Sequence, residues 1–137
     1  MKNDTHYLQV PVRRLVTSGL RKDREDSFID CVIGLEALLS TESERTELSY
    51  KFRVRGSVIL SKRRQERKEL IAMLKRLYDL RSRLVHGGRV SPNDLETSLP
   101  LAEYALRKVW RWFFDHWSNE KSNEKGVVRI DEDLCIR

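Results

Sequence analysis

The sequence predicts an all-α fold, a bundle of about five helices followed by a polar C-terminal tail. Apolar residues recur every three or four positions through most of the chain, which is the spacing of one face of an α-helix. The 137 residues include only 3 prolines and 6 glycines, so residues that interrupt helices are scarce. This length suits a single domain with its own core. We expect residues 1–120 to form that helical domain and residues 121–137 to form the tail.

Two helices are predicted in the first third of the chain. The segment His6–Leu20 has helical apolar spacing, and Pro11 lies near its start, where a missing N–H costs nothing. The segment Arg24–Ser40 is the most apolar of all and should occupy the centre of the bundle. Glu36 is the one acid that interrupts its apolar surface.

The middle of the chain predicts two further helices. In Glu47–Ser61, the alternation of apolar and basic residues in "KFRVRGSV" also fits a strand, but no hairpin partner follows and the wider spacing favours a helix. Lys62–His86 is the longest helical pattern, and Gly87 or Gly88 should supply a left-handed cap at its end.

The last third of the chain is expected to begin as a loop, and its final residues are not expected to join the core of the bundle. Pro92 and Pro100 punctuate the start of Ser91–Trp117, and an aromatic-rich helix follows them. The repeat "SNEKSNEK" then suggests a frayed helix end or a linker. Gly126–Asp131 has the composition of a short strand, which either pairs with another subunit or stays mobile.

Charge and composition limit the classes of function. The formal net charge is +6, which either attracts a polyanion such as RNA or simply keeps the surface soluble. No apolar run approaches the roughly 20 residues of a membrane span, and a cytoplasmic location follows as the default expectation. No metal-binding box or phosphate loop occurs, so we expect no metal and no cofactor. The basic residues expected to contact RNA are Arg63, Arg64, Arg67, Lys75, Arg76 and Arg83.

The stretch "LYDLRSRLVHGG", Leu77–Gly88, contains the candidate catalytic residues. On a regular helix Ser82 and His86 share a face, whereas the side chains of Arg81 and His86 point roughly 140° apart. Two arrangements would bring the pair together. The glycines could let the helix open at its end, or a second subunit could bring its own copy across a two-fold axis.

An arginine and a histidine at one site suit metal-free RNA cleavage. Histidine transfers protons near neutral pH, and the permanent charge of a guanidinium stabilises a phosphate in the transition state. Ser82 could orient either group, and the product would carry a 2′,3′-cyclic phosphate. The alternative interpretation is purely structural. Arg81 would then pair with Glu36, and His86 would be a cation at a helix C-terminus.

The whole pattern resembles a known family. "GLEALL", "ELSYKFRVR" and "LYDLRSRLVHGG", in this order and at these distances, are similar to the Apea-like branch of the HEPN superfamily. The resemblance covers roughly Ser27–Trp117. It implies an up-and-down helical bundle, usually dimeric, whose Arg and His meet at a cleft in the dimer interface. Many members are metal-independent endoribonucleases of antiviral defence, toxin–antitoxin or stress systems, and others are RNA-binding or interaction modules.

The family motif matches this chain residue by residue at Arg81, Ser82 and His86. Ser82 departs from the Asn, Asp or His that often follows the arginine, which weakens the case for its orienting role. Glu36 falls where the family has an acid in the second helix, and we expect it to orient Arg81. Tyr78 is expected to support the site as well.

Two hypotheses follow from the residues and the resemblance together. The first is a homodimeric HEPN ribonuclease that acts on RNA. The second is a non-catalytic HEPN module that binds RNA or a protein. The resemblance also implies an antitoxin or a larger host protein as a partner.

Overall fold

The computed structural model describes residues 6–135 and forms six α-helices in that range, with no strand. The all-α prediction is therefore confirmed, with one helix more than expected. Residues 1–5 and 136–137, which the sequence assigned to the domain and the tail, lie outside the described range. The helices are α1 (Gln9–Leu20), α2 (Arg24–Leu39), α3 (Leu48–Leu60), α4 (Arg64–Val85), α5 (Pro92–Trp117) and α6 (Glu124–Cys135).

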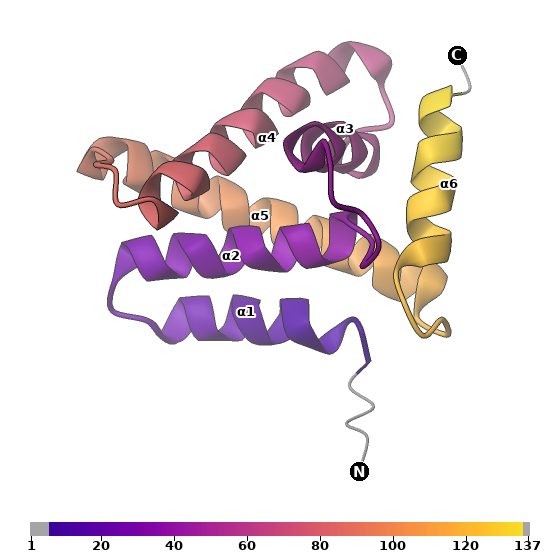
Figure 1. The fold of residues 1–137 in the computed structure, drawn as a ribbon, viewed down its shortest axis with the longest axis horizontal. Helices are drawn as coiled ribbons and strands as arrows, with labels where there is room; N and C mark the ends of the chain where they lie inside the picture. Colours follow the sequence, from indigo (N-terminus) through magenta and orange to yellow (C-terminus); the bar gives the residue numbers. More distant parts are fainter. Residues whose placement is uncertain (1–5, 136–137) are drawn as a thin grey trace.

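Helix α2 occupies the centre of the bundle, as its apolar sequence predicts. Figure 1 shows α1 and α2 side by side in opposite directions, α5 behind α2, and α3 and α4 on the other side. The α2 side chains of Phe28, Leu35 and Leu38 are fully buried. Cys31 is also buried and free, and burial raises the pKa of its thiol to about 11. None of the helices in the described range is long and apolar enough to cross a membrane.

Segment 91–100, expected to be a loop, belongs to α5. Ser91 caps the helix, and its hydroxyl accepts a hydrogen bond from the backbone N–H of Asp94 at 3.1 Å. Pro92 is the first helical residue, where proline is favoured, and Pro100 lies inside the helix. Pro100 is exposed, so water can satisfy the carbonyl that the proline leaves without its helical hydrogen bond.

The C-terminal segment is a helix that packs on the bundle, so the expectation of a short strand is wrong. Val127 and Ile130 of α6 are buried, because their spacing of three residues places them on one helix face. Asn123, just before α6, donates hydrogen bonds from its amide to the carbonyls of Leu38 and Ser40, each at 2.8 Å. These contacts attach the start of α6 to the end of α2.

A buried arginine connects α3 to two other parts of the fold. The guanidinium of Arg55 donates two hydrogen bonds of 2.7 Å to the carboxylate of Glu44, in the loop after α2. It also donates at 3.0 Å to Asp131 of α6 and at 2.8 Å to the carbonyl of Leu39. Its side chain is 5% exposed, so the charge is neutralised by these partners and not by water.

Ile130 and Val128 test whether α6 is part of the domain. The side chain of Ile130 is fully buried and that of Val128 is 57% exposed, on the same helix. We expect Ile130→Ala to lower the free energy of unfolding by about 2 to 5 kcal/mol, through lost burial and a residual cavity. Val128→Ala is the control and should change it by less than about 0.5 kcal/mol. If both variants lower the free energy of unfolding in urea by the same small amount, α6 does not contribute to the core.

Glu44 should contribute to stability against acid. Hydrogen bonds from Arg55 lower the pKa of the Glu44 carboxyl from 4.5 to about 2. A lowered pKa stabilises the folded state above pH 4.5, and this contribution is lost as the pH falls towards about 2. The full shift corresponds to at most about 3 kcal/mol. In unfolding measured from pH 5 to pH 2, Glu44→Gln should lose less stability than the wild type. Glu42→Gln, an exposed change in the same loop, should follow the wild-type curve.

Candidate functional site

His86 lies at the solvent-exposed end of α4. The helix ends at Val85, and the backbone N–H of His86 still bonds to the carbonyl of Ser82 at 3.1 Å. Gly87 then adopts a left-handed conformation with φ of 78°, and its N–H bonds to the carbonyl of Leu84 at 3.2 Å. Gly87 is thus the glycine that caps α4. The chain leaves the helix there, and the imidazole of His86 is exposed.

Arg81 faces α2, where it meets Glu36. The Arg81 Nε lies 3.1 Å from the Glu36 Oε1, and both side chains are 25% exposed. Neither of these two buried atoms makes a well-formed hydrogen bond, so the contact is chiefly electrostatic. Burial raises the pKa of Glu36, and the charge of Arg81 only partly offsets this effect. The sequence predicted this pair, both as the orienter of Arg81 and as its structural partner.

Tyr78 lies beside this ion pair, one turn before Arg81. Its ring contacts that of Phe52 in α3, with the centroids 5.3 Å apart. Burial, and then the charge of Glu36, raise the pKa of the Tyr78 hydroxyl, which therefore stays protonated near neutral pH.

Within one chain Arg81 and His86 do not line a common recess. His86 lines an open recess of about 420 Å³ at the end of α4. Its lining residues are Asp79, Ser82, Arg83, His86 and Gly88, and Arg81 is not among them. Ser82 and His86 therefore share a face, as the helical spacing predicts, while Arg81 is directed to α2.

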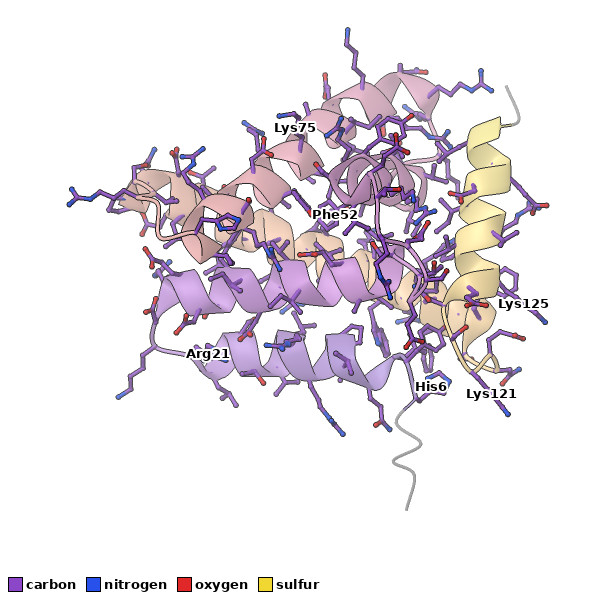
Figure 2. The ribbon with its side chains drawn as sticks, in the orientation of Figure 1. His6, Arg21, Phe52, Lys75, Lys121 and Lys125 are labelled. Carbon is purple, nitrogen blue, oxygen red and sulfur yellow. The ribbon has the colours of Figure 1, made fainter. Side chains whose placement is uncertain are left out.

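The six basic residues expected to contact RNA fall into two groups. Lys75, visible on α4 in Figure 2, pairs with Asp79 at 2.8 Å, and Arg63 pairs with Glu66 at 3.7 Å. Arg67 donates to the carbonyl of Ser61, and the exposed Arg64 also has an interaction partner. Arg76 and Arg83 differ from these four, because neither forms an ion pair with any residue between 6 and 135.

A second recess separates α4 from the start of α5. It has a volume of about 370 Å³, and Arg76 and Arg83 line it. Asp79 and Arg83 line this recess and also the one at His86, so the two are adjacent. Its other wall includes Asn93, Asp94, Thr97 and Ser98. Sequence analysis missed this wall because it assigned these residues to a loop, although Ser91 before Pro92 is a recognisable helix start.

The described residues contain no group of three or more His, Cys, Asp or Glu side chains that could hold a metal ion. No family model, curated protein or solved structure matches the chain.

The need for glycine at position 87 can be tested by alanine substitution, with a second glycine as the control. In Gly87→Ala the left-handed backbone would cost about 1 to 2 kcal/mol of stability. Gly19, near the end of α1, is the control, because a methyl group there meets no atom within 4 Å. Gly19→Ala should leave stability unchanged or raise it by up to about 1 kcal/mol. If both variants unfold at the same urea concentration, the cap at Gly87 does not have the expected strain.

Proposed function

We propose that this chain is a metal-independent endoribonuclease of the HEPN type that acts as a homodimer. The arrangement of three side chains at the end of α4 supports this proposal. There Ser82 and the exposed His86 line one recess, and Arg81, five residues before His86, is held by Glu36. Arg81 supplies a fixed positive charge and His86 a mobile proton, which are the two groups that RNA cleavage without a metal requires.

The proposed chemistry needs only the RNA and these side chains. The 2′-oxygen of the ribose attacks the adjacent phosphorus, and the bond from phosphorus to the 5′-oxygen breaks. His86 transfers the proton that this exchange requires, and Arg81 stabilises the charge that develops on the phosphate oxygens. The products are a 2′,3′-cyclic phosphate and a 5′-hydroxyl. DNA cannot react because it lacks the attacking hydroxyl.

Dimerisation is part of the proposal because one chain separates the two groups. A two-fold axis near the end of α4 would place Arg81 of one chain beside His86 of a second copy. Among the large apolar residues of α4, Val85 is exposed, at 51%, and it lies next to His86. We infer that this end of α4 joins the interface. As the resemblance implies, the biological setting would be defence or stress response, with an antitoxin or a larger host protein as partner.

A specific observation favours a second candidate function, a non-catalytic HEPN module. Arg81 already has an intrachain partner in Glu36, which lowers the positive charge available to a phosphate. Such a module would bind RNA or a protein through the same surface without cutting RNA.

Cleavage of a fluorescent single-stranded RNA distinguishes the two candidates. We expect the wild type to cut in EDTA and to leave 2′,3′-cyclic phosphate ends. His86→Ala should abolish cleavage and retain the fold, because the side chain is exposed. Arg81→Ala should lower both affinity and rate, and Arg81→Lys should not restore them fully. His116→Ala, which removes an exposed histidine on α5, is the matched control and should remain active. Loss of activity in EDTA, or full activity of His86→Ala, would contradict the mechanism.

Mixing the His86→Ala and Arg81→Ala variants tests the site shared between chains. A dimer of one His86→Ala chain and one Arg81→Ala chain contains one intact pair if Arg81 and His86 come from different chains. An equal mixture should then recover about a quarter of wild-type activity, since half of the dimers are mixed and each has one site. No recovery in a mixture shown to exchange subunits would place both groups of the site in the same chain. No cleavage by any form, the wild type included, would favour the binding module.

A further inference from the structure

The recess between α4 and the start of α5 has the dimensions and lining of a site for one nucleotide. Its volume of about 370 Å³ is at the lower end for small-molecule sites. Met73 of α4 and Leu101 of α5, both half-buried, provide the apolar surface of the recess, and the core residues Leu77 and Leu80 lie at its base. A flat base can cover such a surface, and a thioether such as that of Met73 packs well against an aromatic ring.

The α5 wall carries polar groups that can contact the edge of a base. The side chains of Asn93 and Asp94 line the recess and have no hydrogen-bond or ion-pair partner among residues 6–135. Ser98 adds a hydroxyl, whereas the hydroxyl of Thr97 is already bonded to the carbonyl of Asn93 at 2.9 Å. A carboxylate accepts hydrogen bonds and cannot donate them, so Asp94 favours a base that presents an amino group.

The charges of the recess suit a nucleotide with its phosphates. Lys75 neutralises Asp79 at 2.8 Å, which leaves Arg76 and Arg83 opposite the single carboxylate of Asp94. Arg83 lines both this recess and the one at His86. A phosphate held by Arg83 would therefore lie between the base in the first recess and the imidazole at the second.

We propose that this recess, lined by Asp94 and Asn93 on one wall and by Arg83 at the His86 end, binds the base of the nucleotide beside the scissile phosphate. It would select a base that presents an amino group (cytosine, adenine or guanine) over uracil. Cytosine and uracil form the sharpest comparison, because cytosine has an amino donor where uracil has a carbonyl oxygen, which the Asp94 carboxylate repels. This inference rests on the proposed ribonuclease function for the position of the phosphate.

The test measures binding in the His86→Ala background, so that it does not depend on cleavage. The probes are two fluorescent oligouridylates, one uniform and one with a single central cytidine. We expect the cytidine probe to bind about tenfold more tightly. Adding Asp94→Ala should abolish that preference. Adding Glu96→Ala should preserve it, because Glu96 is an exposed acid on the same helix that does not line the recess. Adding Arg83→Ala should weaken both probes alike.

The outcomes separate this inference from the proposed function. If the wild type cuts RNA but the two probes bind equally, or Asp94→Ala and Glu96→Ala behave alike, the nucleotide site is wrong and the ribonuclease stands. If no form cuts RNA but Asp94→Ala still removes the preference for cytidine, the nucleotide site stands as part of a binding module. In an active wild type, cleavage beside cytidine in preference to uridine, lost in Asp94→Ala, would support both.

Discussion

The buried guanidinium of Arg55 is the contact on which the arrangement of the helices depends. It binds Glu44 in the loop after α2, Asp131 in α6 and the carbonyl of Leu39 at the end of α2. A buried charge without partners is expensive, so these groups must stay together once α3 is in place. The last turn of α2 is thereby fixed relative to α3, and α4 packs on α3. Glu36 lies in this part of α2, so its reach to Arg81 depends on the same contact.

Apolar periodicity sufficed to predict α1 to α4 and the part of α5 that follows Pro100, because each of them buries one face along many residues. It failed for α6, where "GVVRI" has three β-branched residues whose local preference is for a strand. Contacts distant in sequence decide the outcome there: Asn123 bonds to carbonyls more than 80 residues away, and Ile130 enters a core built by other helices. Pro100 suggested a loop, but it is exposed, so water can satisfy the carbonyl left without its helical hydrogen bond and α5 continues through the proline.

The sequence predicted which residues form the candidate site, but it did not predict how all of them are arranged in space. The spacing of Ser82 and His86 places them on one helix face, and the structure puts both in one recess. The direction of Arg81 depends on the acid that it meets, and the position of α2 sets that acid. The recess wall that Asn93 and Asp94 form was invisible because it depends on where α5 begins and how closely it passes α4.

The ion pair between Glu36 and Arg81 determines how the two candidate functions should be weighed. Burial raises the pKa of Glu36 in spite of the adjacent guanidinium, so the cost of desolvation exceeds the attraction between the two charges. The Arg81 Nε and the Glu36 Oε1 make no well-formed hydrogen bond, so the contact between them is chiefly electrostatic. An RNA phosphate that approaches Arg81 would compete with Glu36 for the guanidinium. The intrachain contact thus orients Arg81, which is compatible with the proposed role of Arg81 in phosphate binding as well as with a purely structural one.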